Sequence, residues 1–200
     1  MRTQILMIHG GMTFKSKKDY INHLRTRTIS LDKYYSWTKD YMDKLLGKKY
    51  EIIRPRMPLQ DNAKYAEWKI HFERYLPLLK NNVILIGSSL GGIFLAKYLS
   101  ENKFPKKIKA LLLVCPPYDN TISGEDLVGG FKLKKDLSMI DNCSKSVHLF
   151  FSENDPVVPP SQTEKYKKKL KKANIHIYKH IPGHFQISKF PEIINIIKKL

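Results

Sequence analysis

The residues of this 200-residue chain best suited to chemistry are Gly87-Ser88-Ser89-Leu90-Gly91, which follow an apolar run that begins at Val83. The run has the length of a strand, and a helical pattern starts directly after it. A G-x-S-x-G sequence between a buried strand and a helix predicts a sharp turn that presents the middle serine above the end of a sheet. Glycine flanks the serine because a Cβ there would collide as the chain doubles back. Ser89 is therefore the candidate nucleophile.

A serine nucleophile needs a base, and four histidines follow Ser89 in the chain. His148 and His176 fall inside expected strands, where a packed or solvent-facing imidazole is the simpler interpretation. His180 ends the last expected strand, one turn too early for a base. His184 lies in the loop between the last expected strand and the last expected helix, and it is the candidate base.

The base in turn needs an acidic group that fixes its orientation. Asp155 follows the apolar run Val147–Ser152 and lies in a proline-rich loop that suits this task. Glu153 and Asp119 also follow expected strands, so they remain alternatives.

Attack on a carbonyl group produces an oxyanion, which two converging backbone N–H groups can stabilise. We expect one from Leu90, at the start of the helix after the serine. We expect the other from the loop His9-Gly10-Gly11-Met12, with Gly11 as first choice and Met12 as second. The side chain of His9 is expected to hold this loop, and both His9 and Met12 are candidates to lie close to substrate.

These residues are carried by strands and helices that alternate along the chain. The expected strands cover Ile5–His9, Tyr50–Arg54, Val83–Gly87, Ile108–Cys115, Val147–Ser152 and Ile175–His180. The expected helices cover Leu31–Leu46, Ala63–Leu79 with a break at Pro77, Gly91–Ser100, a short segment near Leu133–Ile140, Pro160–Ala173 and Pro191–Leu200. This pattern predicts the α/β class: a three-layer sandwich with an about six-stranded, mainly parallel sheet and helices on both faces. Ligands bind such sheets outside the carboxyl ends of the strands, where the candidate residues stand.

Composition favours one globular domain over residues 1–200, with 42% hydrophobic and 11% aromatic residues. No apolar run approaches the length of about 20 residues that spans a membrane, and the first run is too short for a signal peptide. Cys115 and Cys143 provide no disulfide framework, and Cys115 is expected to be a core thiol. A cytoplasmic location is the simplest expectation.

The net charge of +18 raises the question of a nucleic-acid partner. Lysine supplies 30 of the 36 basic residues and is spread along the whole chain, with no helix-turn-helix, zinc-finger or RNP-like pattern. We therefore expect no dedicated nucleic-acid binding, only weak salt-sensitive attraction to polyanions. No Cys/His cluster has metal-ligand spacing and no dinucleotide or Walker loop occurs, so no cofactor and no metal are expected.

Residues Thr13–Ser30 are polar and basic, without a clear period. They are expected to be either a solvated surface loop or a mobile lid that favours acidic substrates. The basic residues of this segment are Lys15, Lys17, Lys18, Arg25 and Arg27.

Taken in order, these motifs resemble the α/β-hydrolase superfamily, and more narrowly the small serine hydrolases of the retinoblastoma-binding protein nine and YdeN type. The resemblance rests on Met57-Pro58 after the second strand, the serine turn, Asp155-Pro156 and Gly183-His184-Phe185-Gln186. It implies a minimal sheet, no large cap domain and a Ser89–Asp155–His184 triad. One departure is the loop His9–Met12, which stands where that subfamily typically carries a Pro-Gly-Asn-Gly-type loop.

The sequence thus predicts a serine hydrolase that cleaves a carboxylic ester, thioester or amide of a small molecule through an acyl-enzyme intermediate. The alternative is a non-catalytic protein-binding module on the same scaffold, because a fold does not guarantee an activity. A nucleic-acid binder is a more distant third.

Overall fold

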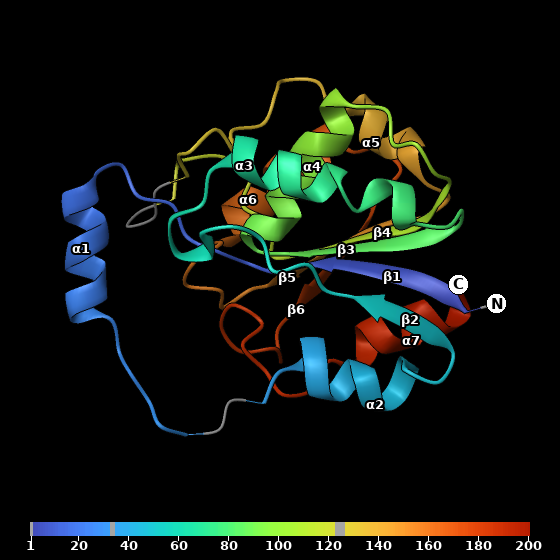
Figure 1. Ribbon diagram of the computed structural model, residues 1–200, viewed down its shortest axis with the longest axis horizontal. Coiled ribbons are helices and arrows are strands. Elements are labelled where there is room, and N and C mark those ends of the chain that lie inside the picture. The colour runs from blue at the N-terminus through green and yellow to red at the C-terminus, as the bar shows by residue number, and fades with distance from the viewer. Residues whose placement is uncertain (1, 33–34, 123–126) are drawn as a thin grey trace.

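The computed structural model describes residues 2–32, 35–122 and 127–200 (Figure 1). Its strands are β1 (Thr3–Ile8), β2 (Tyr50–Ile53), β3 (Val83–Ser88), β4 (Ile108–Val114), β5 (Val147–Ser152) and β6 (Asn174–Tyr178). Its α-helices are α1 (Lys17–Thr26), α2 (Met42–Leu46), α3 (Tyr65–Glu73), α4 (Leu90–Glu101), α5 (Ser138–Cys143), α6 (Pro160–Lys169) and α7 (Pro191–Lys199). The strands form one sheet in the order β2-β1-β3-β4-β5-β6, and every neighbouring pair is parallel.

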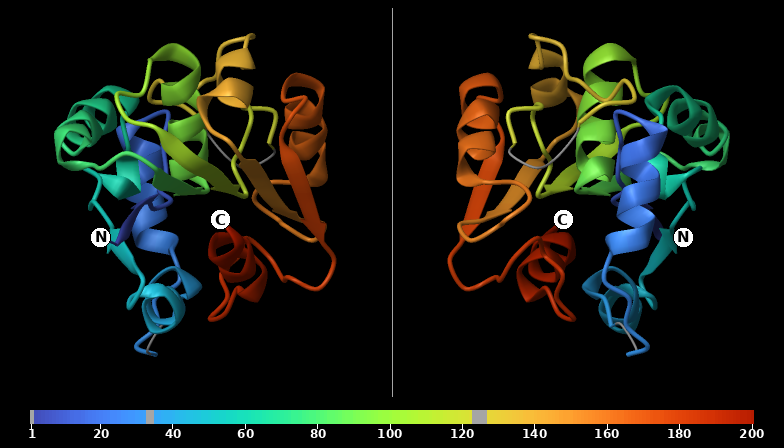
Figure 2. Two further views of the ribbon diagram at one scale, coloured as in Figure 1. Left: turned by 90° about the vertical axis from the view of Figure 1, so that its right-hand side faces the viewer. Right: turned by 90° about the vertical axis from the view of Figure 1, so that its left-hand side faces the viewer.

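Helices cover both faces of this sheet, which confirms the predicted three-layer sandwich (Figures 1 and 2). Helices α3, α4, α5 and α6 lie over one face, while α2 and α7 lie over the other. Successive side chains of a strand point to opposite faces. In β3, Val83 and Leu85 therefore belong to the core under α3 and α4, while Ile84 and Ile86 belong to the core under α2 and α7.

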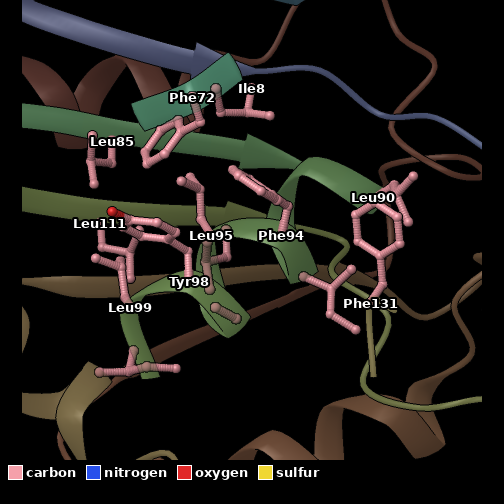
Figure 3. Packing of buried hydrophobic residues seen from close by; sticks show 14 of the residues in the cluster. Ile8, Phe72, Leu85, Leu90, Phe94, Leu95, Tyr98, Leu99, Leu111 and Phe131 are labelled. Atoms are coloured by element: carbon pink, nitrogen blue, oxygen red, sulfur yellow. The ribbon is translucent and has the colours of Figure 1, made fainter. Parts of the chain in front are cut away.

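Aromatic side chains hold α3 and α4 on the sheet (Figure 3). The ring of Phe72 lies 5.2 Å from that of Phe94 and 4.9 Å from that of Tyr98, both in edge-to-face arrangements. Phe72 and Phe94 are fully buried, and each such burial contributes about 1.5–3 kcal/mol to stability. This packing fixes α4, and with it the turn that carries Ser89.

The strand predictions are confirmed to within one or two residues at each end, whereas several helices differ from expectation. The helix expected over Leu31–Leu46 was wrong at its start: a π-helical turn begins only at Trp37 and leads into α2. Residues 33 and 34 of that prediction lie outside the described part. The helix expected over Ala63–Leu79 ends at Glu73, and a separate 3-10 turn contains Pro77, because proline cannot donate to the preceding turn.

Two of the later helices, α5 and α6, also differ from expectation. The short helix expected near Leu133–Ile140 forms as α5, which begins only at Ser138. The helix expected over Pro160–Ala173 ends at Lys169.

The absence of a period in residues Thr13–Ser30 was a misleading signal, because α1 forms within this segment. The side chain of Ser16 caps the helix by accepting a hydrogen bond from the N–H of Asp19 at 3.1 Å. None of the α1 residues is buried, so this helix has no apolar stripe to detect. Figure 1 shows α1 set apart from the rest of the molecule, beyond the carboxyl ends of the strands. Within the described ranges, the structure contains no helix long and apolar enough to cross a bilayer.

Candidate active site

The predicted sharp turn lies between β3 and α4, and Ser89 stands at its apex. Ser89 has φ +53° and ψ −120°, a conformation that residues with a Cβ rarely adopt. A Cβ at Gly87 would lie 2.5 Å from the carbonyl oxygen of Gly91, and one at Gly91 would lie 2.3 Å from the carbonyl oxygen of Ile8. Glycine is therefore required at both positions for the chain to reverse between strand and helix.

Ser89, His184 and Asp155 form one hydrogen-bonded chain, which we call the Ser89–His184–Asp155 chain. The Ser89 hydroxyl lies 2.7 Å from Nε2 of His184, and Nδ1 of His184 lies 2.7 Å from Oδ2 of Asp155. Asp155 is 4% exposed, and its Oδ1 accepts the N–H groups of Val157 and Val158 at 2.8 and 2.9 Å. This carboxylate is thus held in place by backbone donors on one oxygen and orients the imidazole with the other.

The two alternative acids stand elsewhere. Glu153 is exposed, on the same loop as Asp155. The carboxylate of Asp119 lies 2.7 Å from the ammonium of Lys165 on α6. Burial alone would raise the pKa of Asp119, but hydrogen bonds from Lys165, Thr121 and Gln162 lower it to about 2.

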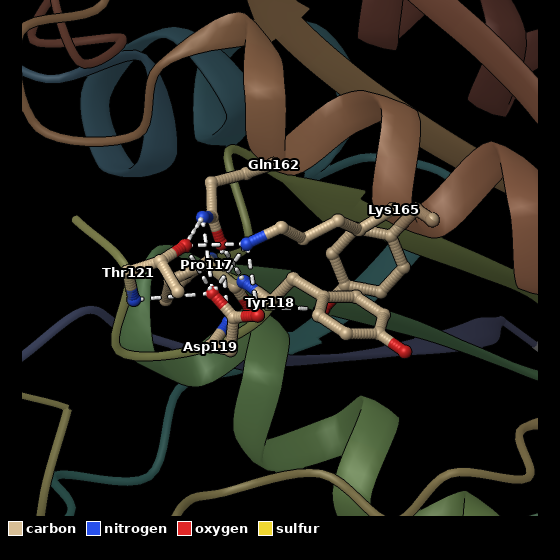
Figure 4. A network of polar contacts seen from close by, with 7 residues as sticks. Pro117, Tyr118, Asp119, Thr121, Gln162 and Lys165 are labelled. Atoms are coloured by element: carbon tan, nitrogen blue, oxygen red, sulfur yellow. Dashed lines mark hydrogen bonds and ion pairs between the residues drawn. The ribbon is translucent and has the colours of Figure 1, made fainter.

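Asp119 also belongs to a network that fixes one wall of the site (Figure 4). The buried amide of Gln162 accepts the N–H groups of Tyr118 and Asp119 at 2.7 and 3.1 Å. The hydroxyl of Thr121 donates to the Asp119 carboxylate at 2.7 Å. The loop after β4 is thereby attached to α6.

The loop that carries His184 is held by two side chains that the sequence did not single out. The indole N–H of Trp37 donates to the carbonyl of Phe185 at 3.2 Å, and the hydroxyl of Ser152 donates to the carbonyl of Ile181 at 2.6 Å. Both contacts join segments far apart in the chain, so no local pattern signals them. Phe185 has φ +52°, which adds to the irregular backbone around the histidine.

The pKa of His184 reflects competing influences. Burial lowers it, whereas the sulfur of Cys115 and the hydrogen bond and charge of Asp155 raise it, and the net result is a pKa raised above the ordinary value of 6.5. The other later histidines are engaged elsewhere: His148 contacts His176 at 3.0 Å, and His180 contacts Glu192 at 2.8 Å.

Cys115 lies directly beside the imidazole of His184. It is fully buried, as expected of a core thiol, but its Sγ is 3.7 Å from Nε2 of His184. The potential ligand atoms of Cys115, Asp155 and His184 all lie within 4.8 Å of one another, so these three residues could hold a metal ion. The position of Cys115 at the end of a strand next to β3 was the available signal, because neighbouring parallel strands end at the same edge.

A cavity of about 400 Å³ lies in front of Ser89 and His184. Its described lining combines apolar and polar residues: Gly10, Gly11, Met12, Thr13, Ser36, Trp37, Thr38, Gln60, Ser88, Ser89, Leu90, Pro117, Asp119, Asn120, Ile122, Leu127, Val157, Val158, His184, Phe185 and Gln186. The predicted oxyanion residues Gly11, Met12 and Leu90 are among them, whereas His9 is not.

His9 instead connects the loop after β1 to the loop after β2. Its Nε2 accepts the N–H of Met57 at 2.9 Å, and its Nδ1 lies 2.6 Å from the carbonyl oxygen of Gly10. One tautomer, with the proton on Nδ1, satisfies both contacts.

The glycines of the loop after β1 lie against the serine turn. A Cβ at Gly10 would stand 3.7 Å from Oγ of Ser89, and one at Gly11 would stand 2.7 Å from the carbonyl oxygen of Gln60. The N–H of Met12 donates to that same Gln60 carbonyl at 2.8 Å, so it is already engaged.

A parallel six-stranded sheet with a serine turn after its third strand defines an α/β-hydrolase fold. The sequence model of the serine hydrolase family matches residues 35–199, and the chain belongs to this family.

Known proteins agree with this assignment. The chain is 25% identical over 170 residues to the serine hydrolase RBBP9 of Rattus norvegicus, covering 84% of this chain and 86% of that protein. Its structure is similar to the ydeN gene product of B. subtilis, with a TM-score of 0.75 and 19% identity over 98% of this chain and 97% of that one. A thioesterase domain from the curacin biosynthetic pathway has a TM-score of 0.65 and 13% identity, over 100% of this chain and 92% of that one. At these identities the structural likenesses establish the fold alone.

Proposed function

We propose that this chain is an active serine hydrolase that cleaves a carboxylic ester, thioester or amide of a small molecule through an acyl-enzyme. The observation that carries the proposal is the Ser89–His184–Asp155 chain, with two contacts of 2.7 Å at the edge of the sheet. Its geometry meets the requirement that a nucleophile touch its base and the base touch an orienting group.

In this mechanism Ser89 Oγ attacks the substrate carbonyl carbon while Nε2 of His184 takes its proton. The tetrahedral intermediate collapses, and His184 returns the proton to the leaving group, which departs and leaves an acyl group on Ser89. Water then attacks the acyl carbon as His184 again acts as base, and the acid product leaves. Asp155 keeps the imidazole in one tautomer and stabilises the charge that it gains.

We assign the oxyanion donors to the N–H groups of Leu90 and Gly11. Leu90 is the first residue of α4, where N–H groups have no partner within the helix. The engagement of the Met12 N–H with Gln60 supports Gly11 over Met12 as the second donor. A glycine also lets the substrate approach the backbone closely.

The cavity favours a short, uncharged acyl group. Its volume of about 400 Å³ is near the lower end of the ~300–1,000 Å³ typical of small-molecule sites. Apolar side chains such as Leu90, Ile122 and Val158 contribute to its walls. Carboxylesterase-like activity on short p-nitrophenyl esters is the expected result.

The test is a series of p-nitrophenyl esters from acetate to palmitate, together with matching thioesters and aminoacyl amides. We expect kcat/KM to peak at short acyl chains, and Ser89→Ala or His184→Ala to lower kcat by about 10³-fold or more. Thermal unfolding of each variant controls for misfolding. A folded wild type that hydrolyses none of these substrates, or a Ser89→Ala variant that retains full activity, contradicts the proposal.

A further inference from the structure

Cys115 is the one thiol at the described active site, and the proposed reaction does not use it. Its side chain is fully buried, and its Sγ lies 3.7 Å from the same Nε2 of His184 that faces Ser89. The second cysteine of the chain, Cys143, is at the end of α5 and lies outside this cluster.

The backbone at Cys115 is also unusual. Its φ of +42° lies in the left-handed region, which a residue with a Cβ enters at a cost of about 1–3 kcal/mol. Its N–H donates to the carbonyl of Phe150 at 2.7 Å, which fixes the residue at the end of β4. Such conformations cluster at functional sites, and here the sulfur lies against the imidazole.

We propose that Cys115 and His184 form a binding site for Zn²⁺ or a similar thiophilic cation, and that the bound ion blocks the base. Typical Zn–S and Zn–N bonds of about 2.3 and 2.0–2.1 Å, meeting at a tetrahedral angle, place sulfur and nitrogen about 3.6 Å apart. The distance between Sγ and Nε2 is 3.7 Å. The two atoms therefore have the separation that a shared ion requires, without movement of the backbone.

Oxygen ligands can fill the two remaining coordination positions of the ion. Asp155 contacts Nδ1 of the imidazole, on the opposite side of the ring from Nε2, at 2.7 Å. It therefore orients His184 and does not bind the ion, so water is the expected third ligand. Water from the cavity supplies the fourth, because His184 lines that cavity. A thiolate, an imidazole and oxygen ligands are a donor set that Zn²⁺ accepts.

Binding of the ion and catalysis exclude each other. The thiol of Cys115 releases its proton to solvent when the Zn–S bond forms, and Nε2 donates its lone pair to the ion. That lone pair is the one that must accept the proton of Ser89. Because the ligands bind in deprotonated form, occupancy by the ion rises with pH. The proposal that the ion binds does not depend on the proposed hydrolase activity. The proposal that the ion inhibits does rest on that activity.

The first experiment measures binding without activity, by titrating the intact protein with Co²⁺ and recording the thiolate-to-cobalt charge-transfer absorption in the near ultraviolet. We expect this band at one equivalent in the wild type, in Cys143→Ser as matched control, and in Ser89→Ala. We expect it to be absent in Cys115→Ser and in Cys115→Ala, the second variant being included in case one misfolds. A wild type without the band at excess Co²⁺, or a folded Cys115→Ser with it, overturns the proposal.

The second experiment measures inhibition of ester hydrolysis by Zn²⁺, with each protein compared with its own zinc-free rate. We expect loss of activity in the wild type that chelation by EDTA reverses, and an inhibitory concentration about tenfold or more higher in Cys115→Ser. Equal zinc sensitivity of the two proteins overturns the inhibition. If the wild type hydrolyses nothing, the proposed function fails, while the cobalt spectrum still decides the ion site.

Discussion

The chemistry of the site depends on a few residues in uncommon backbone conformations. Ser89, Cys115 and Phe185 all have positive φ, each costing about 1–3 kcal/mol. All three lie at or beside the Ser89–His184–Asp155 chain. The surrounding fold must offset this cost, and the hydrogen bond from Trp37 to the Phe185 carbonyl is one of the contacts that do so.

The raised pKa of His184 predicts the pH dependence of hydrolysis. In the proposed mechanism His184 acts as the base only when Nε2 is unprotonated, so we expect kcat/KM to fall as the pH drops through the pKa of His184. Because that pKa is raised above 6.5, we expect the acidic limb of the pH–kcat/KM profile to have its midpoint above pH 6.5.

The matched variant is Asp155→Asn, which removes one group that raises the pKa. We expect it to shift the midpoint to lower pH and to reduce kcat strongly, because the tautomer is no longer fixed. A wild-type midpoint at or below pH 6.5 contradicts the prediction.

The three residues of the Ser89–His184–Asp155 chain could be predicted because each follows a strand of a parallel sheet, where local sequence fixes position. Cys115 also stands at the end of a strand, but a cysteine that ends a buried strand predicted only a core thiol. The fold was needed to show that its sulfur lies beside the imidazole of His184. Trp37 could not be found at all, since its partner Phe185 is 148 residues away in the chain.

At the scale of elements, the strands were predicted more closely than the helices. A buried strand is a short apolar run with clear ends, whereas helix ends depend on capping and tertiary packing. Helix α1 shows this most plainly: Ser16 caps it, yet none of its residues is buried, so hydrophobic periodicity gave no signal.

The basic residues of the segment Thr13–Ser30 allow a test of the lid hypothesis. None of the five is among the described residues that line the cavity, so we expect their replacement by Gln to leave the ratio of kcat/KM for anionic and neutral esters unchanged. All five side chains are exposed, so each replacement taken singly should change the free energy of unfolding by no more than about 0.5 kcal/mol. A selective loss of activity toward anionic esters would instead support a basic lid.

The pairing of β5 with β6 brings His148 and His176 together, with Nδ1 and Nε2 3.0 Å apart. Burial, and next the neighbouring His176, lower the pKa of His148 to about 4; burial also lowers the pKa of His176. In the unfolded chain these imidazoles accept protons near pH 6.5. The stability they contribute is therefore complete above pH 6.5 and is lost as the pH falls from 6.5 toward 4.

We expect protonation of these two histidines to lower the free energy of unfolding, measured in urea, by about 1 kcal/mol between pH 7.5 and 4.5. The fall is this small because both side chains are partly exposed and solvent screens their charge. His148→Gln, which cannot be protonated, should show a smaller fall over the same range. An equal fall in both proteins would mean that other groups cause it.

At the scale of the whole molecule, the sheet acts as a platform between two cores. The face under α3 and α4 and the face under α2 and α7 are both packed, so the strand ends are fixed relative to one another. This explains how three residues from distant loops can meet at hydrogen-bonding distance.

The net charge of +18 is a property of the whole molecule. Lysines attract any polyanion. Without a motif that recognises bases, this attraction is weak and falls as the salt concentration rises. We expect fluorescence anisotropy with labelled duplex DNA and RNA to give a Kd weaker than about 10⁻⁶ M at 150 mM salt, with no sequence preference. Tight, sequence-dependent binding that persists at this salt concentration would contradict the expectation.

The central claim is that Ser89 is a nucleophile activated by His184 and Asp155. Its most direct test is labelling with a fluorophosphonate probe, followed by peptide mass spectrometry to locate the adduct. We predict one adduct per chain, on Ser89, with labelling abolished in Ser89→Ala and slowed by orders of magnitude in His184→Ala. A folded wild type that stays unlabelled, or an adduct on another residue, would contradict the account.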